Sequence, residues 1–91
     1  MRVTLIFTTH FRAMLGIDRS ELSLQEGAVV ADAIATFLAG NPHHRSVLEE
    51  RKGFLFGKLK AIYSIDGRAV KPDHELSDGD QVKVLKAFIG G

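Results

Sequence analysis

The sequence contains no cysteine and only two prolines in 91 residues. Without cysteine the chain cannot form a disulfide framework, a thiolate metal site or a cysteine nucleophile. Three classes are therefore excluded at once: disulfide-stapled secreted domains, thiolate metalloproteins and cysteine enzymes. The same absence fits a reducing compartment, and we expect a cytoplasmic protein.

A strong net charge and a long apolar run are also missing. The formal net charge is +1, so no overall field attracts nucleic acid or an anionic membrane, and we expect neither as a partner. The longest uncharged stretch, Ala33 to Pro42, is too short to span a bilayer. The apolar run after Met1 is shorter than the core of a signal peptide and lacks a small-residue cleavage site. With 45% hydrophobic and 25% charged residues, the chain has the composition of one globular domain.

Period-two alternation at the N-terminus predicts a strand with one buried face. Its inward positions are Val3, Leu5 and Phe7. Ile6 breaks the alternation and is expected on the outer face. Gly16 and Asp18 indicate a turn, and residues 20–25 alternate again, so an opening hairpin is predicted.

After Gly27 the period changes to that of an amphipathic helix. The apolar residues at helical spacing are Val29, Val30, Ala33, Ile34, Phe37 and Leu38. Gly40-Asn41-Pro42 ends this helix, with Gly40 available for a left-handed cap. A short second helix is predicted over residues 43–52.

Strand character returns at residues 59–65, and Asp66-Gly67 is a hairpin signal followed by a return strand at 68–70. A turn at residues 77–80 precedes a last strand over 81–87, with Val82 and Val84 inward. This order predicts an α+β fold of β-grasp type. We expect a mixed sheet of four to five strands, one main helix across one face, and a short second helix.

The sequence ends in Phe88-Ile89-Gly90-Gly91. Two glycines at two fixed positions arise by chance about once in 200 chains, at roughly 7% usage each. A frayed terminus is the alternative interpretation. We expect a β-grasp domain over residues 1–87 and a flexible tail over 88–91.

The combined pattern resembles the MoaD/ThiS family of sulfur carriers, prokaryotic relatives of ubiquitin, over nearly the whole chain. The stretches that carry the resemblance are Phe11-Arg12-Ala13-Met14-Leu15-Gly16, Asp73-His74-Glu75-Leu76-Ser77-Asp78-Gly79-Asp80-Gln81-Val82 and the final Gly90-Gly91. The length and the N-terminal half look more like MoaD, the small subunit of molybdopterin synthase. MoaD tails commonly carry two prolines where this chain has Lys86-Ala87, and the tail is closer to that of ThiS.

The resemblance implies a function that resides in the C-terminal carboxylate. An E1-like adenylating enzyme of MoeB/ThiF type would use ATP to adenylate Gly91, and a sulfur donor would convert the adenylate to a thiocarboxylate. Gly90 would let the backbone enter a narrow active site, because glycine has no Cβ. A larger synthase subunit of MoaE type, or a thiazole synthase, would receive the sulfur. The resemblance implies a carrier rather than an enzyme, with no bound cofactor.

Partner recognition is expected on the sheet face opposite the helix and on the tail. Leu85 and Ala87 would point outward beside Ile6 and Thr8. Large apolar residues on a tail can anchor in a partner, or else pack on the carrier's own sheet. The anchors of this kind are Phe88 and Ile89.

Other chemistry has little support in the sequence. His43-His44 lacks a nearby third ligand, so we predict no metal site. The lysines of the strands form either a solvated surface or a patch for an acidic partner groove; these are Lys58, Lys60, Lys83 and Lys86. Two other functions stay open: a modifier joined through Gly91 to lysines, as ubiquitin is, and a plain β-grasp binding module.

Overall fold

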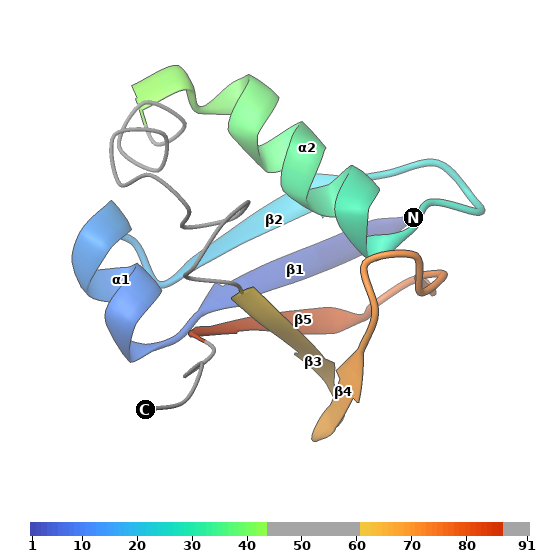
Figure 1. Cartoon of the computed structure of the whole chain (residues 1–91). Coiled ribbons are helices and arrows are strands. Elements are labelled where there is room, and N and C mark those ends of the chain that lie inside the picture. Colours follow the sequence, from blue (N-terminus) through green and yellow to red (C-terminus); the bar gives the residue numbers. More distant parts are fainter. Residues whose placement is uncertain (44–60, 87–91) are drawn as a thin grey trace.

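The computed structural model describes residues 1–43 and 61–86. The elements in chain order are β1 (Arg2–Phe7), α1 (Thr9–Leu15), β2 (Arg19–Ser23), α2 (Val30–Gly40), β3 (Ala61–Ile65), β4 (Arg68–Val70) and β5 (Gln81–Lys86). The strands form one sheet in the order β2-β1-β5-β3-β4 (Figure 1). β1 pairs with β5 in parallel and the other neighbours are antiparallel. The predicted α+β fold with a mixed sheet is confirmed.

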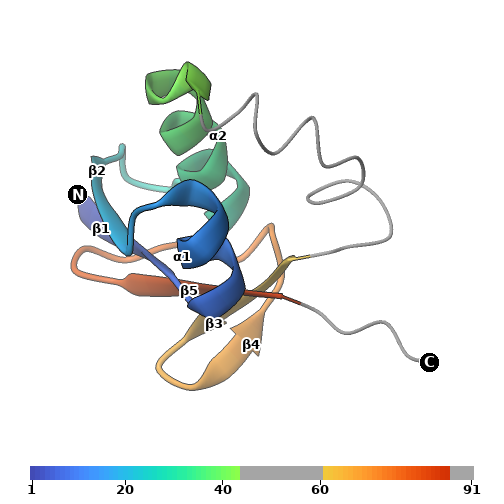
Figure 2. The same cartoon turned by 90° about the vertical axis from the view of Figure 1, so that its left-hand side faces the viewer.

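The molecule has two layers. Both helices lie on the same side of the sheet, with α2 crossing it and α1 at one end (Figures 1 and 2). The core between the layers is apolar and consists of Val3, Leu5, Phe7, Phe11, Leu15, Val30, Ala33, Phe37, Ile65, Leu76, Val82 and Val84. The opposite face of the sheet, called the outer face below, is not covered by any helix among the described residues.

The main helix forms where the helical period predicts it. Val30, Ala33 and Phe37 are buried, and the Phe37 ring packs against the Phe7 ring with centroids 5.0 Å apart. The Asp32 carboxylate accepts a hydrogen bond of 2.9 Å from the Val29 N–H, which satisfies one backbone donor before the first turn.

The predicted left-handed cap at Gly40 is wrong. Gly40 is the last helical residue, and the cap residue is Asn41 with φ −137°. The Asn41 side-chain amide donates a hydrogen bond of 2.8 Å to the Phe37 carbonyl. This side chain satisfies a carbonyl at the helix end, so no left-handed glycine is needed there.

The predicted opening hairpin needs a correction. β1 and β2 do pair antiparallel, but α1 connects them instead of a tight turn. Phe11 and Leu15, four residues apart, are buried on one face of α1. The helix ends at Gly16, whose φ of +76° is left-handed and whose N–H donates to the Arg12 carbonyl. Seven residues supply only two core positions, too few for a clear helical period. The short helix that was predicted lies at residues 43–52, of which 44–52 are outside the described residues.

The predicted turn at Asp66-Gly67 is confirmed. Both residues have positive φ, 52° and 79°, as a type I′ hairpin turn requires. The turn joins β3 to β4 and sets their register, with Ser64 opposite Ala69.

Removing the aromatic centre of the core is expected to be costly. Phe37→Ala should lower the free energy of unfolding by about 3–5 kcal/mol, because it deletes a buried ring and leaves a cavity beside Phe7. Urea denaturation of the variant and the parent chain measures the loss. Thr36→Ala, on the exposed side of the same helix, is the control and should change stability by less than about 0.5 kcal/mol. A loss below about 1 kcal/mol for Phe37→Ala would contradict the packing described here.

Candidate functional site

The last strand lies in the middle of the sheet. β5 pairs with β1 on one side, with Phe7 beside Val84, and with β3 on the other, with Tyr63 beside Val84. Val82 and Val84 are buried, which confirms the prediction that they point inward. By alternation, Lys83 and Leu85 belong to the outer face.

The start of β5 is joined to β1 through the turn at residues 77–80. The Arg2 N–H donates to the Asp78 carboxylate at 2.7 Å, and the Gly79 N–H donates to the Arg2 carbonyl at 2.8 Å. The Thr4 N–H donates to the Asp80 carbonyl at 3.0 Å. Gly79 has a φ of +87°, a conformation that side-chain-bearing residues rarely adopt. The Asp-Gly-Asp stretch is therefore more than a local turn, because it joins the two parallel strands at their first residues.

The other end of β5 is fixed by Thr8. Its hydroxyl donates a hydrogen bond of 2.9 Å to the Val84 carbonyl, and its backbone N–H lies 3.3 Å from the same oxygen. The strand is thus held two residues before Lys86, where the described part of the chain ends. Thr8 was predicted as a partner-binding residue. In the structure Thr8 is half-buried, and its hydroxyl donates a hydrogen bond within the domain, to the Val84 carbonyl.

The outer face brings together apolar residues from three strands. Ile6 of β1 lies beside Lys83, and Leu85 lies opposite Ile62 of β3. Ile6 and Leu85 are half-buried, and Ile62 is 42% exposed. Two predicted binding residues, Ile6 and Leu85, therefore lie on one face of adjacent strands.

Ile62 was not predicted as a site residue. The alternation of Ala61, Tyr63 and Ile65 on the inner side identifies Ile62 as an outer-face residue, and this signal was present in the sequence. The remaining predicted site residues lie outside the described part of the chain: Ala87, Phe88, Ile89, Gly90 and Gly91.

The inner side of β3 carries one perturbed ionisable group. Burial raises the pKa of the Tyr63 phenol above its ordinary value, because desolvation penalises the phenolate. Tyr63 lies on the helix side of the sheet, beside Val84 and Val70, and its packing belongs to the core.

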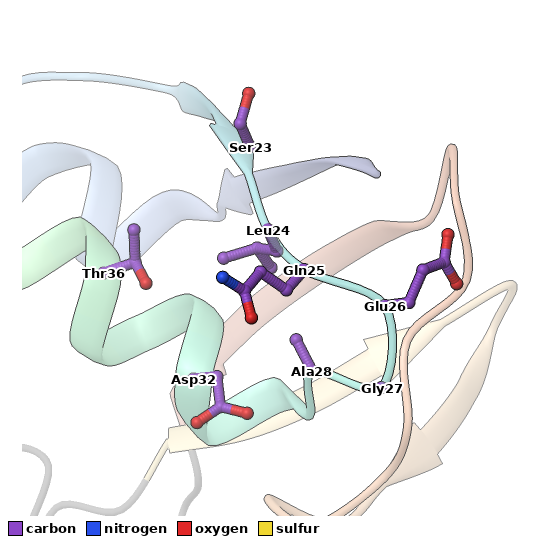
Figure 3. A pocket seen from close by; sticks show the side chains of 8 residues that line it. All are labelled: Ser23, Leu24, Gln25, Glu26, Gly27, Ala28, Asp32 and Thr36. Atoms are coloured by element: carbon purple, nitrogen blue, oxygen red, sulfur yellow. The ribbon is translucent and has the colours of Figure 1, made fainter.

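A pocket lies at the other end of the molecule, between the loop after β2 and the first turns of α2. It is lined by Ser23, Leu24, Gln25, Glu26, Gly27, Ala28, Asp32 and Thr36. Gln25 and Asp32 face the space between loop and helix, whereas Ser23 and Glu26 turn away from it (Figure 3). The Asp32 carboxylate already accepts the Val29 N–H. The pocket is distant from the end of β5 (Figure 1), so we do not assign it to the same site.

The described residues offer no cluster of side chains that could hold a metal ion. Within residues 1–43 and 61–86, no three His, Asp or Glu side chains come together as metal ligands. Within the same ranges, no helix is long and apolar enough to cross a membrane.

Comparison with known proteins identifies the fold. No protein-family model and no curated protein matches the chain. SAMP1 from Haloferax volcanii is similar in structure over the full length of both chains, with a TM-score of 0.76 and 18% identity. A putative molybdopterin converting factor subunit 1 from Pyrococcus furiosus gives a TM-score of 0.69 and 29% identity, over 97% of this chain and 99% of the other.

A third similar structure is a complex of subunits 1 and 2 of the molybdopterin-converting factor from Helicobacter pylori. The match has a TM-score of 0.58 and 16% identity, and it covers all of this chain and all of the matched chain of the complex. The chain has the ubiquitin-like β-grasp fold, and the resemblance to MoaD/ThiS proteins that the sequence indicated is confirmed.

The Thr8 hydroxyl is expected to stabilise the end of β5. Thr8→Val keeps the shape of the side chain but leaves the Val84 carbonyl without its hydroxyl donor, so the free energy of unfolding should fall by about 1 kcal/mol. Amide hydrogen exchange near Val84 should become faster in the same variant. Thr4→Val is the matched control, because no hydrogen bond of the Thr4 hydroxyl is observed within the described residues. Equal effects of the two substitutions would refute the assigned role of Thr8.

Proposed function

We propose that the chain is a sulfur carrier whose Gly91 carboxylate is adenylated by an E1-like enzyme and then converted to a thiocarboxylate that donates sulfur in cofactor biosynthesis. The observation that carries the proposal is the position of β5. This strand is fixed in the middle of a ubiquitin-like sheet and ends at Lys86, and the sequence continues from there to Gly90-Gly91.

The chemistry needs an activated acyl group. A carboxylate is a poor electrophile because its charge is delocalised over two oxygens. In the proposed first step, a Gly91 carboxylate oxygen bonds to the α-phosphorus of ATP and pyrophosphate leaves. Hydrosulfide released by the donor then bonds to the acyl carbon, the bond from that carbon to the AMP oxygen breaks so that AMP leaves, and loss of the S–H proton gives the thiocarboxylate. Residues without a Cβ let the enzyme's groups approach the acyl carbon from more than one side, a reason for glycine at positions 90 and 91.

The folded domain would supply recognition rather than catalysis. Ile6, Leu85 and Ile62 form an apolar area on the outer face, next to the end of β5. An area of this kind on adjacent strands is suited to docking, whereas single exposed apolar residues are ordinary. Phe88, Ile89 and Ala87 would extend the contact along the tail.

Within this proposal, we favour the small subunit of a molybdopterin synthase. The putative molybdopterin converting factor subunit from Pyrococcus furiosus is 29% identical over nearly all of both chains. The Helicobacter pylori protein is in a complex of subunits 1 and 2, which supports a larger MoaE-type subunit as partner here. A ThiS-like carrier that serves a thiazole synthase is the alternative, because the tail lacks the two prolines common in MoaD.

A second candidate function is protein modification. Two structures of small archaeal modifier protein 1 (SAMP1) from Haloferax volcanii share the fold over most or all of the chain, which supports this candidate. Adenylation of Gly91 is common to both functions, and a conjugate linked to lysine in cells would favour the modifier. In a plain binding module the glycines would have no role, and truncating the tail would leave function unchanged.

Gly91 should be essential for sulfur loading. We expect Gly91→Ala, or deletion of Gly91, to abolish loading when the chain is incubated with an E1-like enzyme, ATP and a sulfur donor. Intact mass spectrometry detects the replacement of one oxygen by sulfur and places it in the C-terminal peptide. Gly40→Ala is the control, because a Cβ there meets no atom within 4 Å and φ is not left-handed. Normal loading of either Gly91 variant would disprove the proposal.

The apolar area should contribute to enzyme binding. Ile62→Gln is expected to raise the KM for loading about tenfold with little change in kcat, because it removes apolar contact without disturbing the core. Ala35→Gln, on the exposed side of α2, is the control and should leave KM unchanged. An unchanged KM for Ile62→Gln, with a folded protein confirmed by circular dichroism, would exclude Ile62 from the docking area.

A further inference from the structure

Two positive side chains flank the apolar area on the outer face. In one row across the sheet, Arg19 of β2 lies beside Ile6 of β1, and Ile6 lies beside Lys83 of β5. Ile6 is between the buried Leu5 and Phe7, so all three members of the row belong to the outer face. Neighbouring strands are about 4.8 Å apart, which separates the backbones at Arg19 and Lys83 by roughly 10 Å.

Within the described residues, neither of these two cations forms an ion pair with a carboxylate. A third cation on the described part of this face, Arg2, lies 3.8 Å from Glu21, which is opposite Thr4 in the middle of β2 and two residues from Arg19 on the same face. The Asp78 and Asp80 carboxylates accept backbone N–H groups in the turn before β5. Arg19 and Lys83 are both exposed and make no ion pair or side-chain hydrogen bond within residues 1–43 and 61–86. The described outer-face positions of the strands therefore carry three cations, Arg2, Arg19 and Lys83, and one carboxylate, Glu21, although the chain as a whole carries only +1.

The fold itself does not account for both charges. A cation on an edge strand discourages pairing with other chains, and this accounts for Arg19 on β2. Lys83 lies on β5, which has a neighbour on each side, so edge protection does not apply there. Exposure to solvent does not require a charge on this strand either, because Gln81, a neutral polar residue of β5, is also exposed.

We propose that Arg19 and Lys83 select a partner protein whose docking surface is an apolar depression flanked by carboxylates. The inference rests on the proposed function, because the partner is the enzyme that loads Gly91. Opposite charges around an apolar contact accelerate association and reject partners of the wrong charge. An anionic membrane is a poorer match, because recognition of that kind uses clusters of four to eight basic residues rather than two around an isoleucine.

The test is a charge reversal with a matched control. R19E/K83E and R68E/K71E change the net charge by the same amount, and Arg68 and Lys71 are exposed residues outside the row. We expect R19E/K83E to raise the KM for loading at least tenfold with kcat unchanged. The KM of the parent chain should increase between 50 and 500 mM NaCl, and that of R19E/K83E should depend little on salt. R68E/K71E should behave like the parent chain.

Each result decides the inference. If wild-type chain is loaded and R19E/K83E keeps the wild-type KM, the two cations are only solvated and the inference is wrong. If both double variants raise KM equally, net charge and not this row is responsible, which also overturns it. Binding of the parent chain to phosphatidylserine vesicles, with an unchanged KM for R19E/K83E, would assign the cations to a membrane instead. Failure of every tested enzyme to load wild-type chain would refute the proposed function, and the inference with it.

Discussion

The parallel pairing of β1 with β5 is the contact that the rest of the structure depends on. β1 is the first strand and β5 the last, so their register, with Leu5 beside Val82 and Phe7 beside Val84, brings together residues more than 70 positions apart. All four side chains are buried beneath the helices. The entropy lost in closing so long a loop is repaid by this burial and by the strand pairing. β2 adds to the open side of β1, and β3 adds to the open side of β5, so the sheet is built outward from this pair.

The same pairing determines the position of β5, the strand that precedes the proposed reactive residue Gly91 in the sequence. Hydrogen bonds from Arg2 and Thr4 to the turn at residues 78–80 hold the start of β5, and the Thr8 hydroxyl holds the Val84 carbonyl near its end. A strand held at both ends gives Lys86, the last described residue of β5, a defined position in the sheet. The helices cover one face of the sheet, and no helix of the described residues covers the other.

Local signals predicted most of the elements, and the misses have physical reasons. The helical stripe from Val30 to Phe37 and the Asp66-Gly67 turn depend on neighbours within a few residues, and both were found where expected. The helix α1 was missed because seven residues give too short a period, and its burial of Phe11 depends on the rest of the core. The cap at Asn41 was misassigned to Gly40, since a side-chain amide competed successfully with a left-handed glycine.

For β1, α2 and β5 the sequence by itself determined which residues face the core, because alternation and helical spacing are properties of a single segment. It also contained the Gly90-Gly91 ending and the Asp-Gly-Asp stretch that carry the family resemblance. Only the tertiary structure decided which outward residues become neighbours. Ile62 lies beside Leu85, and Arg19 and Lys83 flank Ile6, because strands from distant parts of the chain pair in one particular register. A period of two fixes the face of each residue, but it carries no information on the adjacent strand or on the residue opposite, and these are set by the packing of the whole sheet.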